Sequence, residues 1–68
     1  MTTKEPHPTP DRFIRRKEVV QLTTLPPSTI TRLINKGLFP KQYKLSERSA
    51  AWKLSEVIHW MDSKANQT

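Results

Sequence analysis

Residues 26–40, PPSTITRLINKGLFP, constrain the fold most because they indicate both ends of one short helix. Pro27 suits the first helical position, where its fixed backbone angle is helical and its missing amide hydrogen would have no partner. Pro26 suits the preceding position less well than Ser, Thr, Asp or Asn, whose side chains cap free amides. Gly37 is typical of the residue that ends a helix. We therefore expect a helix over residues 27–36.

The expected helix has two unlike faces, because successive residues lie about 100° apart around its axis. The apolar face contains Ile30, Leu33 and Ile34, and the opposite arc contains Ser28, Thr31, Arg32 and Asn35, with Lys36 at its border. A face shaped only by solubility would normally mix Glu with Lys, and this arc has no acid. Arg, Asn, Ser and Thr are side chains that hydrogen-bond to base edges in the major groove. A structural helix whose outer side is incidentally neutral is the alternative.

Positive charge is concentrated in the middle of the chain. The net charge is +6, and residues 12–48 alone contain nine basic and two acidic residues, which gives +7. Such a field attracts polyanions. The basic residues fall on several short elements rather than on one long amphipathic helix, so nucleic acid is favoured over an anionic membrane. A solvated basic surface with no partner remains the alternative.

The chain is short and lacks the residues of a stapled or metal-bound fold. It has 68 residues, no cysteine and two scattered histidines, so we expect one small domain held by packing, with no cofactor or metal. We expect no enzyme, because Glu56, His59 and Asp62 share an exposed helix face where solvation explains them. No apolar run approaches the roughly 20 residues of a spanning helix, and the N-terminus does not resemble a signal peptide. We therefore expect a cytoplasmic protein, associated with the nucleoid when it binds DNA.

The remaining segments predict one folded domain between two tails. Residues 1–11 contain three prolines and almost no large apolar residue, as is typical of a disordered tail. The domain should span residues 12–64, with a short C-terminal tail at residues 65–68. Within it we predict a short extended lead-in from which Ile14 enters the core, a helix over residues 16–23, a tight turn over 23–25, a β-hairpin within 41–54, and a third helix after an N-cap at Ser55. The predicted core consists of apolar residues from these elements: Val19, Leu22, Leu25, Ile30, Leu33, Ile34, Leu45, Trp52, Val57, Trp60 and Met61.

Two helices joined by a tight turn and followed by a basic hairpin compose a winged helix-turn-helix, in a fold that is mainly α with a small β-hairpin. In helix-turn-helix proteins the second helix enters the major groove while flanking elements contact phosphates. We therefore expect base-edge or nearby phosphate contacts from Ser28, Thr29, Thr31, Arg32 and Asn35, beside Lys36. We expect phosphate contacts from basic residues before and after this helix: Arg15, Arg16, Lys17, Lys41, Lys44 and Arg48.

From residue 12 to residue 64 the sequence resembles the AlpA family of phage-derived transcriptional regulators, whose domain belongs with the excisionase and MerR-type winged helix-turn-helix proteins. The matching segments are EVVQLT, STITRLINKGLFPK, KLSERSAAW and SEVIHWM, in that order. The sequence departs from the family pattern at Pro26, where a serine cap is common, at Thr31, where a tyrosine is frequent, and at Ser46 and Glu47, which replace a common Gly-Pro. The resemblance implies a compact DNA-binding domain that acts in mobile-element biology.

Two functions follow from this reading and stay open at the level of sequence. The first is a sequence-specific double-stranded DNA-binding regulator of transcription in a prophage or integrative element. The second is an excisionase-type recombination directionality factor that binds or bends attachment-site DNA and contacts an integrase. Expected partners are double-stranded DNA, RNA polymerase or a phage integrase, and further copies of the chain bound cooperatively on DNA.

Overall fold

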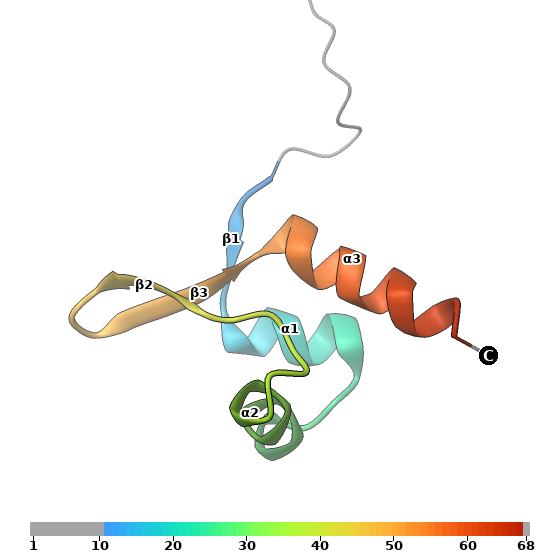
Figure 1. The fold of residues 1–68 in the computed structure, drawn as a ribbon. Coiled ribbons are helices and arrows are strands. Elements are labelled where there is room, and N and C mark those ends of the chain that lie inside the picture. Colours follow the sequence, from blue (N-terminus) through green and yellow to red (C-terminus); the bar gives the residue numbers. More distant parts are fainter. Residues whose placement is uncertain (1–10, 68) are drawn as a thin grey trace, which may run out of the picture.

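The computed structural model describes residues 11–67, which form three helices and a three-stranded sheet (Figure 1). In chain order the elements are β1 Phe13–Ile14, α1 Arg16–Thr23, α2 Pro27–Asn35, β2 Tyr43–Ser46, β3 Ser49–Lys53 and α3 Leu54–Ala65. The prediction of a mainly α fold with a small β-hairpin is confirmed. The predicted disorder of residues 1–10 lies outside the described residues, as does residue 68. α3 includes Ala65, although the sequence predicts this residue in the C-terminal tail.

The sheet is antiparallel, with strand order β1-β3-β2. β2 and β3 form the predicted hairpin, here called the wing (residues 43–53), which projects away from the helices in Figure 1. The predicted extended lead-in is the strand β1, which pairs with β3 so that Ile14 lies opposite Trp52. Both side chains are buried on one face of the sheet. The short lead-in therefore joins the wing to the helical part of the domain.

The turn between α1 and α2 is held by the hydroxyl and amide groups of two threonines. The Thr23 hydroxyl donates to the Val19 carbonyl (2.8 Å) and accepts from the Leu25 amide (3.3 Å). Thr24 adopts a left-handed conformation (φ 64°), and its amide donates to the Val20 carbonyl at 2.7 Å. The chain therefore reverses within a few residues, as the helix-turn-helix prediction requires.

α2 ends in a double hydrogen bond around a glycine. Gly37 has φ +73°, and its amide donates to the Ile34 carbonyl at 3.0 Å. The Leu38 amide donates to the Leu33 carbonyl at 2.8 Å, which completes a Schellman motif. The helix stops one residue before the predicted end at Lys36, which is the C-cap.

The core is centred on Trp52, which is fully buried. The ring of Phe39 meets the Trp52 ring edge-on at 6.4 Å and the Trp60 ring at 4.7 Å between centroids. Both indole N–H groups donate to the chain that leaves α2: Trp52 to the Pro40 carbonyl (3.0 Å) and Trp60 to the Leu38 carbonyl (2.8 Å). These contacts hold the end of α2 against β3 and α3.

The predicted core was wrong at two leucines, included Met61, which is half-buried and outside the core cluster, and missed other residues. Leu22 is 37% exposed because α1 turns the side that contains Val19 and Val20 toward the core. Leu45 is 44% exposed because it lies in the wing at a register shift between Lys44 and Ser46. The buried side chains that the sequence analysis did not include are Phe39, Ala51 and Leu54.

The predicted N-cap of α3 at Ser55 was also wrong. α3 begins at Leu54, and its N-cap residue Lys53 makes no side-chain capping bond. Instead the Asp11 carboxylate accepts from the Ser55 amide (3.1 Å) and the Ser55 hydroxyl (3.0 Å), and the Arg12 carbonyl accepts from the Leu54 amide (2.8 Å). The hydrogen bond from the Ser55 amide is the main cause that lowers the pKa of Asp11. Asp11, which we had predicted at the end of the tail, therefore caps a helix more than forty residues away in sequence.

Candidate nucleic-acid interface

The polar arc of α2 faces solvent. Ser28, Thr31, Arg32 and Asn35 are exposed, Lys36 beside them is exposed, and Thr29 is half-buried. Ile30, on the opposite side, is fully buried, and Leu33 and Ile34 pack partly against the core. The two predicted faces of this helix are therefore confirmed. The arc contains hydrogen-bonding side chains and one cation, with no acid.

The start of α2 needs little capping. Its N-cap is Pro26, which has no side-chain hydrogen bond to offer, but neither Pro26 nor Pro27 has an amide hydrogen that requires a partner. The amides of Thr29 and Ile30 both donate to the Pro26 carbonyl, at 3.0 and 3.1 Å. The two prolines thus fix the backbone conformation at the start of α2.

Arg16 occupies a place that the sequence did not reveal. It is half-buried, its guanidinium lies over the ring of Trp52 at 5.6 Å from the centroid, and its Nη1 donates to the Thr31 Oγ1 at 3.3 Å. One side chain therefore links α1, α2 and β3. We had grouped Arg16 with the phosphate contacts of its neighbours, because no local pattern shows that this residue crosses to a helix fifteen positions further on.

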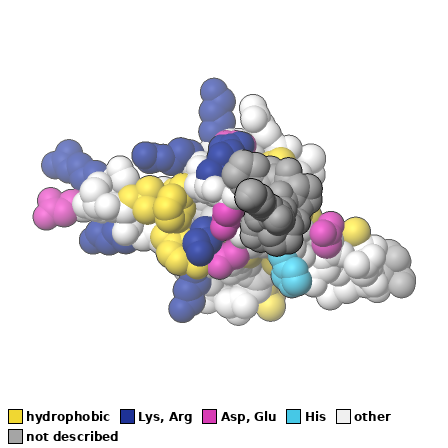
Figure 2. Space-filling model, turned by 90° about the horizontal axis from the view of Figure 1, so that it is seen from above, with side chains coloured by type: hydrophobic (Ala, Val, Ile, Leu, Met, Phe, Trp, Pro, Cys, Tyr) yellow, Lys and Arg dark blue, Asp and Glu magenta, His cyan; other side chains and the backbone are white. Residues whose placement is uncertain are grey.

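The other predicted phosphate-binding residues are exposed on either side of α2 in sequence. Arg15 and Lys17 lie at the start of α1, and Lys41 precedes the wing by two residues. Lys44 lies in β2, and Arg48 lies in the two-residue tip of the wing. Lys44 pairs with Ala50, which lies two residues from Trp52 in β3, so Lys44 is on the sheet face that Arg16 covers. Figure 2 shows that the visible Lys and Arg side chains gather over the half of the molecule that carries the wing.

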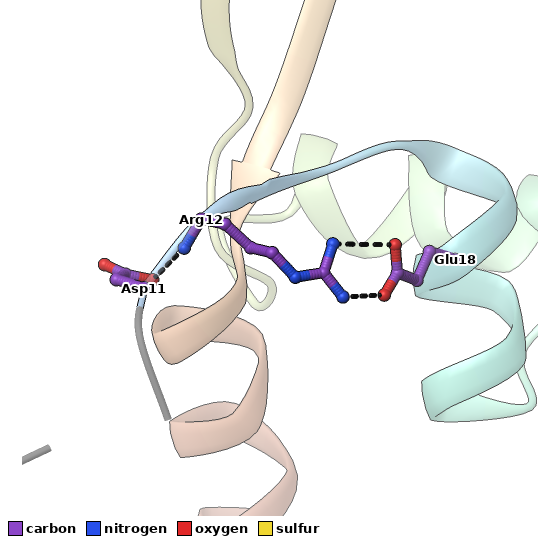
Figure 3. Close-up of polar contacts among 3 residues, drawn as sticks. All are labelled: Asp11, Arg12 and Glu18. Carbon is purple, nitrogen blue, oxygen red and sulfur yellow. Dashed lines mark hydrogen bonds and ion pairs between the residues drawn. The ribbon is translucent and has the colours of Figure 1, made fainter. Parts of the chain in front are cut away.

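Glu18, one of the two acidic residues within residues 12–48, forms an ion pair with Arg12. Both guanidinium ends of Arg12 donate to the Glu18 carboxylate, at 3.2 and 2.6 Å, in the paired geometry of Figure 3. This hydrogen bonding lowers the pKa of Glu18 and raises that of Arg12. The charges of Arg12 and Glu18 therefore cancel each other. Glu18 does not weaken the positive field of the other basic residues.

One acidic residue of α3 is bound by a residue of the wing. The Tyr43 hydroxyl donates to Glu56 at 2.8 Å, and this bond raises the pKa of Tyr43. Glu56 is thus half-buried and engaged, rather than fully solvated as predicted, while His59 and Asp62 are exposed. Among residues 11–67 no group of three or more His, Cys, Asp or Glu side chains is placed to hold a metal ion. In the same part of the chain, no helix has the length and apolar character needed to cross a membrane.

The folded part of the chain matches a known protein family. Residues 12–65 match the profile of a family described as prophage CP4-57 regulatory protein (AlpA). The chain is also 48% identical over 56 residues to the uncharacterized protein ORF88 of Enterobacteria phage P4. That alignment covers 82% of this chain and 64% of the phage protein, so the chain spans less than two thirds of this relative's length. The profile match runs from the residue before β1 to the last residue of α3, and on this basis the chain belongs to the AlpA family of prophage regulatory proteins.

Proposed function

We propose that the chain is a sequence-specific double-stranded DNA-binding regulator, with α2 in the major groove and the wing on the backbone or in the minor groove. The observation that carries this proposal is the exposed, acid-free arc of α2, set between basic residues of α1 and of the wing. A helix with its side chains is about 10–12 Å across, which fits a major groove about 12 Å wide.

The side chains divide by chemistry into two roles. Ser28, Thr31, Arg32 and Asn35 supply the donors and acceptors that distinguish base pairs, and Arg32 has the fork that suits guanine. Arg15, Lys17, Lys41, Lys44 and Arg48 supply charge for phosphates, which gives affinity without sequence preference. The hydrogen bonds from Trp52 and Trp60 to residues 38–40 support the proposal, because they attach the chain that leaves α2 to β3 of the wing and to α3.

The proposal is tested by selecting bound sites from random double-stranded DNA with the purified protein. We expect one sequence to be enriched, and its position in the host element separates a promoter regulator from an excision factor at an attachment site. The same positions identify the expected protein partner, RNA polymerase in the first case and an integrase in the second. Recovery of unenriched random DNA would contradict the proposal.

Two alanine variants then separate base recognition from phosphate contact. Arg32→Ala is expected to relax specificity at one base pair by about 1–3 kcal/mol, with little change at the others. Lys44→Ala is expected to weaken binding to all sequences equally and to reduce the slope of log K against log salt by about 0.9. Equal losses on selected and random DNA for Arg32→Ala would refute its assignment, and an unchanged salt slope for Lys44→Ala would refute that of Lys44.

A further inference from the structure

We propose that Arg16 determines how Thr31 recognises DNA: it occupies one of the two lone pairs of the Thr31 hydroxyl, sets its positive charge beside the other and leaves the hydroxyl hydrogen to donate. The base that Thr31 meets must then offer an acceptor, so α2 discriminates against cytosine at that position. This inference rests on the proposed function and specifies the recognition made by the same surface. It makes Arg16 a positioning residue rather than a phosphate contact.

The direction of the hydrogen bond follows from the chemistry of the two groups. A guanidinium has five N–H donors and no acceptor, so in the 3.3 Å contact between Arg16 Nη1 and Thr31 Oγ1 the hydroxyl oxygen can only accept. A hydroxyl has one hydrogen and two lone pairs. Among residues 11–67 Arg16 is the one hydrogen-bond partner of the Thr31 side chain, and Thr31 is exposed. Its hydrogen has no acceptor among these residues and is available to donate to a group outside α2.

The position of Arg16 is fixed from the other side. Its guanidinium lies over the Trp52 ring, and Trp52 is fully buried with its indole N–H bonded to the Pro40 carbonyl. Arg16 itself is half-buried. A long side chain with one planar face on a fixed ring loses less freedom when it also binds Thr31. The contact between Arg16 and Thr31 is therefore prepared before any DNA is bound.

This arrangement changes what a threonine can distinguish. An unconstrained Ser or Thr hydroxyl binds either donors or acceptors on base edges. A second donor that approached Thr31 would come close to the cation of Arg16, whereas an acceptor would meet a hydroxyl polarised by that cation. Guanine, adenine and thymine all present an acceptor in the major groove, while cytosine presents only its amino donor. Cytosine is thus the base that the pair rejects.

The test measures affinity for the selected site and for sites with all four bases at each position. The wild-type protein is expected to bind about tenfold less tightly when cytosine replaces the preferred base at one position. Arg16→Met covers the Trp52 ring without a donor, and it is expected to reduce that discrimination to about twofold while discrimination at the other positions is kept. Thr31→Val is expected to lose discrimination at the same position, and Thr31→Ser to keep it.

Several outcomes would overturn the proposal. If Arg16→Met weakens binding to every site equally and lowers the salt slope by about 0.9, Arg16 is a phosphate contact and the proposed function stands without this inference. If Arg16→Met and Thr31→Val change different positions, or if their effects add in the double variant, the two residues do not act as a pair. Thr31→Val alters an exposed side chain, so an unchanged base preference in this variant overturns the proposal even if Arg16→Met does not fold. A wild-type protein with no sequence preference would overturn the proposed function as well.

Discussion

Thr24 holds a backbone conformation that a β-branched residue rarely adopts. Its φ of 64° places it in the left-handed region, which costs a residue with a Cβ about 1–2 kcal/mol. Glycine relieves that cost but adds about 0.5–1 kcal/mol of chain freedom to the unfolded state. We therefore expect Thr24→Gly to raise the free energy of unfolding by up to about 1 kcal/mol, measured by urea denaturation.

Alanine at the same position is the matched control for this prediction. Thr24→Ala removes the branch and the hydroxyl but keeps the Cβ, so most of the backbone cost remains. It is expected to stabilise the protein less than Thr24→Gly. An equal gain in both variants would assign the effect to the threonine side chain, and a loss in the glycine variant would show that the left-handed turn is not strained.

The roles of residues that act on the neighbouring backbone could be predicted from the sequence. The roles of residues that depend on a partner far away in the chain could not. Pro27 and Gly37 act on the backbone next to them, so the bounds of α2 were predicted to within one residue. Arg16 has the same local signature as Arg15 and Lys17, yet it alone reaches Trp52 and Thr31. That difference depends on how α1 and α2 pack against each other in the folded domain, and the residues next to Arg16 in the sequence do not show this packing.

At the scale of one element, the stability of α3 depends on a carboxylate from outside it. Asp11 accepts two hydrogen bonds from Ser55, and its pKa lies below the ordinary value of 3.8. The unfolded chain therefore takes up this proton at a higher pH than the folded protein does. The stabilisation is fully present above the ordinary pKa and is lost as the pH falls through the lowered one.

Asp11→Asn is the variant that tests this dependence. It is expected to lower the midpoint of thermal unfolding near neutral pH and to make the fall in that midpoint between about pH 6 and pH 2 shallower than in the wild type. Part of the fall should remain, because the pKa of Glu18 is also lowered, by its pairing with Arg12. Glu47→Gln is the control, since Glu47 has no ion pair among residues 11–67. A variant that loses stability in acid as steeply as the wild type would contradict the capping role.

The elements themselves were predicted better than their caps and contacts. α1 has the predicted bounds, and the wing lies within the predicted hairpin, because both follow the spacing of apolar residues. The N-cap at Ser55 was wrong because the same local pattern fits a serine that caps and a serine that is itself bound by Asp11. The strand pairing of β1 was missed because two residues are too few to show an alternation.

At the scale of the whole molecule, Phe39 connects the segment after α2 with β3 and α3. It follows the end of α2 and lies between Trp52 of β3 and Trp60 of α3. Its role could not be predicted from the sequence, because Gly37 and Pro40 indicate only that a helix ends in this segment. Its 5% exposure shows that the segment is instead a part of the core.

Loss of Phe39 should therefore threaten the entire domain rather than one element. Phe→Ala changes in cores cost about 3–5 kcal/mol, and 57 described residues correspond to a total stability of about 3–9 kcal/mol. We expect Phe39→Ala to be largely unfolded or close to its midpoint at 37 °C, as measured by far-UV circular dichroism and tryptophan fluorescence. Leu45→Ala is the control, because Leu45 is 44% exposed in the wing and should cost less than about 1 kcal/mol. A Phe39→Ala protein that unfolds in urea at the same concentration as Leu45→Ala would show that the two tryptophans hold the end of α2 without the ring between them.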